Sequence, residues 1–134
     1  MAIQYSMTHR TNAMSTLNTD IGANCVIKIF TGAVPGDCAV ADTGTLLVTF
    51  AGNATAFGAA ASGVLTVNAV GNATAVDTGT AGYFRIYPSA ATTTNAVMQG
   101  TCGTASADMI LTSTSINNGQ LMQFTSMTIT AFGA

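Results

Sequence analysis

The stretch CVIKIFTGAVPGDCAVADTGTLLVTF (residues 25–50) carries the pattern that decides the fold. Two apolar runs rich in β-branched and aromatic residues, 25–31 and 45–50, flank a segment that contains Gly, Pro and Asp. Runs of this length and composition, bounded by turn residues, are typical of β-strands. The stretch therefore predicts two strands that are joined by a long loop over residues 33–44.

The same pattern continues to the end of the chain. Short apolar runs separated by Gly, Asn and Asp are typical of an all-β sandwich or barrel, and they place further strands at 63–70, 82–87, 96–101, 108–112 and 120–131. Neither alternating face of 120–131 is cleanly apolar, which indicates cover on both sides, by the core and by a partner. The residues expected in the core are Ile27, Ile29, Leu47, Leu65, Val67, Phe84, Ile86 and Leu111.

Only the N-terminal part predicts a helix, because side chains between residues 8 and 21 recur on one face at Arg10, Met14, Leu17 and Ile21. Ser6 or Thr8 can cap its start, and Gly22 its end. The predicted architecture is mainly β: an antiparallel β-sandwich or jelly-roll-like domain over 25–134 with one N-terminal α-helix. An N-terminal arm and helix over 1–24 precede the sandwich within a single globular unit.

Charge is scarce in this chain. Charged residues make up 6% of it, against roughly 25% in an ordinary soluble domain. The formal net charge is −2 and the basic residues are not clustered, which excludes nucleic-acid binding, because that requires several basic side chains on phosphates. So few charges indicate a protein that works inside an assembly; the alternative is a neutral, hydroxyl-rich β surface without a partner.

No targeting or membrane segment is expected. The N-terminal residues lack a basic stretch followed by an apolar one, and no run reaches the ~18–20 apolar residues of a membrane span. We therefore expect synthesis in the cytosol and no membrane partner. Asn53 and Asn72 match the N-x-T glycosylation pattern, which has no use without secretion.

The three cysteines, Cys25, Cys38 and Cys102, have no C-x-x-C spacing. We expect them to be small buried hydrophobic residues rather than zinc ligands or a disulfide framework. One disulfide remains an open alternative if the protein ends in an oxidising medium.

The tetrapeptide DTGT occurs at 42–45 and again at 77–80, and Asp-Thr-Gly is also the active-site signature of aspartic proteases. In those enzymes two carboxylates share a proton, and each comes from its own lobe or chain. Here the intervening segment is too short for a lobe, and the strands follow the motif instead of preceding it. The turn interpretation predicts that Asp42 and Asp77 accept nearby backbone N–H groups, that Gly44 and Gly79 have positive φ, and that the carboxylates do not meet.

No other reactive constellation is evident. His9, the only histidine, has no carboxylate near it in the sequence. Asp37 and Asp42 share a loop with several carbonyl groups, the kind of oxygen ligands that calcium takes, but no calcium-loop motif is present. Arg85, inside an aromatic strand, can cover Tyr83 or Tyr87, pair with an aspartate or reach a neighbouring subunit; a structural role within the chain is the default. We assign no catalytic, cofactor-binding or metal residue and expect no enzyme.

Four segments carry a family resemblance: R-x-N-A-M at 10–14, IKIFTGAVPGDCAVADTGTLL at 27–47, GTAGYFRIYPS at 79–89 and QGTCGTASADMILTSTSINNGQ at 99–120. As a set they resemble small virion structural proteins of tailed bacteriophages. The resemblance implies a capsid decoration, or cement, protein on the capsid exterior. Its partners would be the major capsid protein and copies of itself, with the N-terminal helix or the 31–44 loop as a binding arm. No functional residue is transferred by this resemblance.

Two alternatives stay open beside decoration. One is a tail, baseplate or fibre component of the same virion, whose partner would be a tail or baseplate protein. The other is a host-surface glycan-binding module, which usually presents exposed aromatic side chains. That alternative is weak, because the chain has no Trp and only three tyrosines, Tyr5, Tyr83 and Tyr87.

Overall fold

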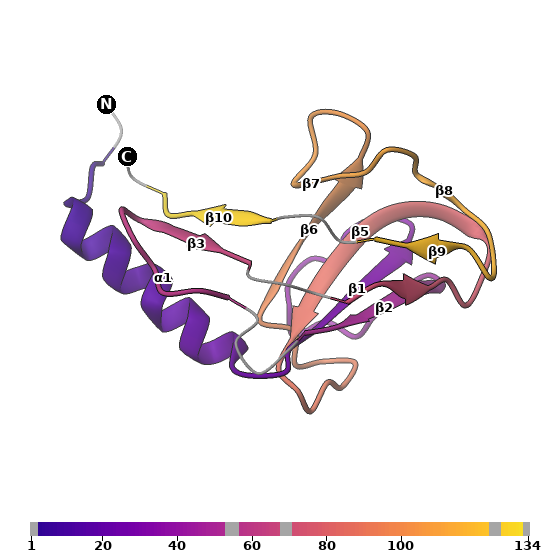
Figure 1. Cartoon of the computed structure of the whole chain (residues 1–134), viewed down its shortest axis with the longest axis horizontal. Helices are drawn as coiled ribbons and strands as arrows, with labels where there is room; N and C mark the ends of the chain where they lie inside the picture. Colours follow the sequence, from indigo (N-terminus) through magenta and orange to yellow (C-terminus); the bar gives the residue numbers. More distant parts are fainter. Residues whose placement is uncertain (1–2, 53–56, 68–70, 124–126, 133–134) are drawn as a thin grey trace.

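The computed structural model describes residues 3–52, 57–67, 71–123 and 127–132. The protein is mainly β with one N-terminal helix and more than one sheet, as the sequence predicts (Figure 1). A sandwich or jelly-roll arrangement of these sheets stays a prediction. The elements are α1 (Met7–Ile21), β1 (Val26–Thr31), β2 (Leu46–Ala51), β3 (Val64–Thr66), β4 (Ala73–Thr74), β5 (Gly79–Tyr87), β6 (Met98–Gly103), β7 (Met109–Ile110), β8 (Ser115–Ile116), β9 (Leu121–Met122) and β10 (Thr128–Thr130).

The helix begins and ends at the residues that the sequence indicates. The Ser6 Oγ accepts a hydrogen bond from the His9 N–H at 3.1 Å, so Ser6 is the N-cap. Gly22, with φ of 72°, ends the helix and donates its N–H to the Asn18 carbonyl at 2.9 Å. The buried apolar stripe of α1 is thin and consists of Met14 and Ile21. The helix is therefore stabilised by packing against the β3 region.

The largest sheet has the strand order β2-β1-β5-β6-β7, and β8 pairs with the start of β5. β1 pairs antiparallel with β2 and β5, and β5 pairs antiparallel with β6. β6 and β7 pair in parallel, which corrects the purely antiparallel expectation. The long strand β5 lies between β1 and β6 (Figure 1). Most of its side chains are buried.

One face of this sheet forms the apolar core. Ile27 and Ile29 of β1 lie opposite Ile86 and Phe84 of β5, and this face packs with Leu65 and other apolar residues of the remaining elements. Leu111 is only half-buried, at the edge of this cluster. The other predicted core residues are buried as expected: Ile27, Ile29, Leu47, Leu65, Val67, Phe84 and Ile86.

The C-terminal segment differs from the prediction of one strand over 120–131. Two short strands form there instead: β9 pairs with β4, and β10 pairs with β3. Leu121 of β9 is 58% exposed, so the chain itself does not cover both faces of this segment. β4 and β8 were not predicted, since strands of two residues leave no periodic pattern in a sequence.

Some predicted features lie outside the described residues: Asn53, residues 68–70 of the predicted strand 63–70, and residues 124–126. Within the described ranges, no helix has the length and apolar character needed to cross a membrane.

Candidate functional site

The loop over residues 32–44 folds back across the second face of the central sheet. Two hydrogen bonds close its base: the Thr31 N–H donates to the Thr45 carbonyl at 3.0 Å, and the Thr45 N–H donates to the Thr31 Oγ1 at 2.8 Å. Gly44 has φ of +72°, and a Cβ on it would lie 2.2 Å from the Thr31 carbonyl oxygen. The base of the loop therefore requires glycine at this position.

A buried arginine of the central sheet binds this loop. Arg85 of β5 is fully buried, and its guanidinium donates hydrogen bonds to five acceptors. Its Nε and Nη2 contact the Gln99 Oε1 at 3.0 and 2.8 Å, and its Nη1 contacts the Asp42 Oδ1 at 2.8 Å. The remaining acceptors are the carbonyls of Val40 at 2.8 Å, Asp37 at 3.0 Å and Thr93 at 3.4 Å.

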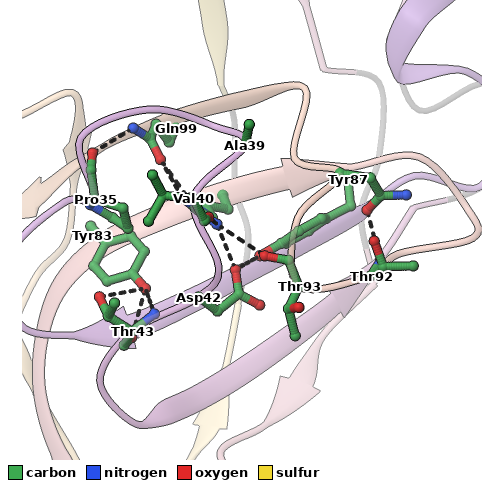
Figure 2. Close-up of polar contacts among 12 residues, drawn as sticks. Pro35, Ala39, Val40, Asp42, Thr43, Tyr83, Tyr87, Thr92, Thr93 and Gln99 are labelled. Atoms are coloured by element: carbon green, nitrogen blue, oxygen red, sulfur yellow. Dashed lines mark hydrogen bonds and ion pairs between the residues drawn. The ribbon is translucent and has the colours of Figure 1, made fainter.

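Two tyrosines of β5 complete the network. The Tyr87 hydroxyl donates a very short hydrogen bond to the same Asp42 Oδ1. The Tyr83 hydroxyl donates to the Thr43 carbonyl at 2.6 Å and accepts the Thr43 N–H at 3.0 Å, as Figure 2 shows. From β6, Gln99 donates its amide to the Pro35 carbonyl at 2.8 Å. The loop is thus attached to the sheet at several points between residues 35 and 43.

The electrostatics of the network favour a charged Arg85 and a neutral Tyr87. Burial by itself lowers the pKa of Arg85, but the hydrogen bonds and charge interactions with Asp42 and Tyr87 outweigh it, so that the pKa rises. Burial, followed by the neighbouring Asp42 carboxylate, raises the pKa of the Tyr87 hydroxyl well above its ordinary value. Arg85 is therefore charged and Tyr87 is neutral at neutral pH, as the hydrogen bonds that they donate require.

This arrangement is suited to holding a loop rather than to catalysis. One oxygen of the Asp42 carboxylate, Oδ1, accepts hydrogen bonds from both Arg85 and Tyr87. The Arg85 donors are also used within the chain, and the side chain is inaccessible to a ligand. The default prediction for Arg85, a structural role with an aspartate partner, is confirmed.

The two DTGT motifs have different surroundings. Asp77 is exposed, and its Oδ1 accepts the adjacent Thr78 N–H at 2.8 Å, as the turn interpretation predicts. Asp42 instead binds Arg85 and Tyr87, six and eight residues further along β5 than Gly79. At ~3.3 Å per residue, this places the two carboxylates roughly 20 Å apart along the strand. They do not meet, so the protease geometry is absent.

Two details of the turn interpretation are wrong. Asp42 binds side chains of β5 rather than nearby backbone, because the loop folds onto the sheet. Gly79 begins β5 without a positive φ, whereas Gly44 has one, as predicted. A Cβ on Gly79 would lie 2.7 Å from the Thr31 Cγ2, so this glycine is required for space rather than for φ.

The other candidate residues serve local structure. The Asp37 Oδ1 accepts the N–H groups of Ala39 at 2.7 Å and Val40 at 3.1 Å. This candidate calcium ligand therefore stabilises its own turn. Across the described ranges, no group of His, Cys, Asp or Glu side chains is arranged to hold a metal ion. The His9 ring stacks on Tyr5 at a centroid distance of 5.0 Å.

The cysteines are unpaired thiols in this structure. Cys25 is buried, while Cys38 and Cys102 are half-buried. Burial raises the pKa of Cys25. Burial, together with the nearby Asp108 charge, raises the pKa of Cys102 to about 12. Neither of these two thiols is an activated nucleophile.

The sequence did not identify Gln99 or the Thr43 contact with Tyr83. The available signal was Gln99 itself, a polar side chain in the predicted strand 96–101, which lies opposite Arg85 in the sheet register.

Comparison of the chain with family models, with curated proteins and with solved structures gives no match.

Proposed function

We propose that the protein is a non-enzymatic structural protein of a bacteriophage virion, and that it decorates the capsid exterior in many copies. The observation that carries this proposal is a surface with little charge that exposes large apolar side chains. The exposed charged residues are four aspartates, since the arginines and the lysine are buried or half-buried. The exposed large apolar residues are Ile3, Tyr5, Met7, Val40, Val76, Ile110, Leu121 and Phe132. Such a surface can bury area with little cost of desolvating charge.

The 32–44 loop is one binding arm in this proposal. Val40 is 43% exposed near the middle of the loop, while its own carbonyl is held by Arg85. Because the loop is already ordered, binding costs little additional conformational entropy. A contact of modest size is then sufficient when a lattice repeats it many times.

The ends of the chain supply the second arm. The N- and C-terminal segments lie at the same end of the molecule in Figure 1, and Tyr5 packs edge-on against Phe132 at 5.6 Å. Ile3 is 76% exposed and Phe132 is 73% exposed. This terminal patch is separate from the loop, so one copy could contact two neighbouring capsid subunits.

The finer architecture that we propose is a sandwich, in which the small β-sheets cover the apolar face of the central sheet.

The alternatives differ in what they require of the surface. A tail, baseplate or fibre component would use the same apolar contacts in a ring or trimer. A glycan-binding module would need accessible aromatic rings. Tyr83 and Tyr87 are fully buried, so among the described residues this alternative would have to use Tyr5 and Phe132 of the terminal patch.

Binding to purified capsids tests the proposal. We expect the protein to cosediment with capsids at on the order of hundreds of copies per particle, and particles without it to release DNA at lower temperature. Val40→Asp should weaken this binding, whereas Thr16→Asp, on the exposed side of α1, is the matched control. A stoichiometry of about a dozen or fewer, located at the tail, would favour the tail component instead.

A further inference from the structure

A cavity of about 370 Å³ opens beside strand β7, at the edge of the central sheet. Its floor contains the buried side chains of Ile29, Phe50 and Met109. Its mouth includes the exposed residues Asp108 and Gln123. Cavities of roughly 300–1,000 Å³ with an apolar floor and a few polar groups are typical of small-molecule sites.

Three methionines from different segments converge on this cavity: Met109 of β7, Met122 of β9 and Met127, which precedes β10. Methionine side chains are flexible and polarisable, and their sulfur atoms make favourable contacts with the edges of aromatic rings. The methionine side of the cavity can therefore adapt to a flat aromatic body, whereas Ile29, Ile110, Leu111 and Thr128 form stiffer parts of the lining.

Asp108 gives the mouth a negative charge. Its Oδ2 accepts hydrogen bonds from the Thr101 N–H at 2.9 Å and from the Thr101 hydroxyl at 3.0 Å. These bonds lower the pKa of Asp108, so the carboxylate is ionised at neutral pH. The described hydrogen bonds of its side chain use only Oδ2, and no described contact involves Oδ1.

The chain offers no cation of its own to this carboxylate. Its three basic side chains are placed elsewhere: Arg85 pairs with Asp42 at 2.8 Å, Lys28 lies over the Tyr87 ring at 5.0 Å, and Arg10 lies on α1 against Gly63. A positive group at the mouth would have to come from a ligand.

We propose that this cavity binds a small arylalkylamine, with the aromatic ring among the three methionines and the ammonium group at Asp108. The volume of the cavity indicates whether its occupant is a free molecule or a lysine side chain of a partner protein. At ~30 Å³ per water-sized group, the cavity holds about a dozen such groups, so the five atoms of a lysine side chain would leave more than half of it empty. None of the residues that line this cavity belongs to the 32–44 loop or to the terminal patch, the two binding arms proposed above.

Three probes of nearly equal size test the proposal: 3-phenylpropylamine, 3-phenylpropanol and 3-phenylpropionate. Each is titrated into protein labelled with ¹³C at the methionine methyl groups. We expect the amine to bind about fivefold more tightly than the alcohol, as a partly exposed ion pair allows, and the carboxylate to bind most weakly. The signals of Met109, Met122 and Met127 should shift, while that of Met14, a buried residue of α1, should not.

Two variants separate charge from shape. Asp108→Asn keeps an acceptor for Thr101 but should abolish the preference for the amine over the alcohol, whereas Asp20→Asn on α1 should leave it unchanged. Gln123→Trp, at an exposed position on the mouth, should block all three probes without loss of folding. The proposal is overturned if no probe shifts these methionines, if the amine has no advantage, or if a lysine-containing peptide binds more tightly than the amine.

Discussion

Arg85 and Asp42 form an ion pair at 2.8 Å between residues that are 43 positions apart, and the arginine side chain is completely buried. Asp42 is 12% exposed and supplies the only carboxylate among the described contacts of the guanidinium. Because Arg85 cannot lose its proton, removal of Asp42 would leave a charge without its partner inside the protein. The pair therefore fixes the loop on the sheet, and the two DTGT motifs allow this to be tested.

Asp42→Ala should lower the free energy of unfolding by about 3 kcal/mol, because it breaks a buried pair from one side. Asp77→Ala removes the same residue from the second DTGT, where Asp77 is exposed and caps a turn, so its effect should be at most about 1 kcal/mol. Urea denaturation of both variants measures the difference. Equal losses would contradict the assignment of the two motifs to different roles.

Tyr87 makes stability depend on alkaline pH. Its pKa is raised in the folded state above the ordinary value of 10, so above pH 10 the folded protein retains a proton that the unfolded chain releases. The contribution is fully present below pH 10 and is lost as the pH rises toward the folded-state pKa. We expect the free energy of unfolding of the wild type to fall above pH 10, and to fall less steeply in Tyr87→Phe.

Urea titrations at pH 8 and at pH values above 10 check this expectation. Tyr5→Phe is the control, since Tyr5 lies on the terminal patch and outside the arginine network. Identical slopes in Tyr87→Phe and the wild type would remove Tyr87 as the cause.

The cysteines should react with iodoacetamide in a fixed order. Cys38 lies half-buried in the 32–44 loop, whereas Cys25 is buried and Cys102 has a pKa raised to about 12. The raised pKa keeps Cys102 as the unreactive thiol at pH 8, so Cys38 should be alkylated first. Peptide mass spectrometry over time measures the three rates, and full unfolding in urea should equalise them. Faster labelling of Cys102 than of Cys38 in the folded protein would contradict this order.

The sequence predicted those parts of the fold whose signals are local. The helix, with Ser6 and Gly22 at its ends, follows from capping chemistry, and β1, β2 and β5 follow from apolar runs bounded by turn residues. β4 and β8 have two residues each and exist because distant segments pair with them. Such strands depend on tertiary contacts, which periodicity does not record.

The sequence indicated the residues of the candidate site but not the contact between them. Arg85 stood out as an arginine among aromatic residues, and Asp42 stood out within DTGT, but nothing local links them. Their pairing requires the 32–44 loop to fold back over β5, which depends on the close approach of Gly82 to the Gly32 carbonyl. A Cβ on Gly82 would lie 1.9 Å from that oxygen, and the sequence shows only another glycine.

The glycines of the loop offer the most direct test of its geometry. Gly44 has φ of +72° and no room for a Cβ beside the Thr31 carbonyl oxygen, whereas a Cβ on Gly36 would have no atom within 4 Å. Gly44→Ala should lower the free energy of unfolding by at least about 2 kcal/mol, the sum of a left-handed alanine and a backbone clash. Gly36→Ala should be neutral or stabilising by up to about 1 kcal/mol, because it restricts the unfolded chain. Urea denaturation separates the two, and a Gly44→Ala variant as stable as Gly36→Ala would show that the loop base is not closed as described.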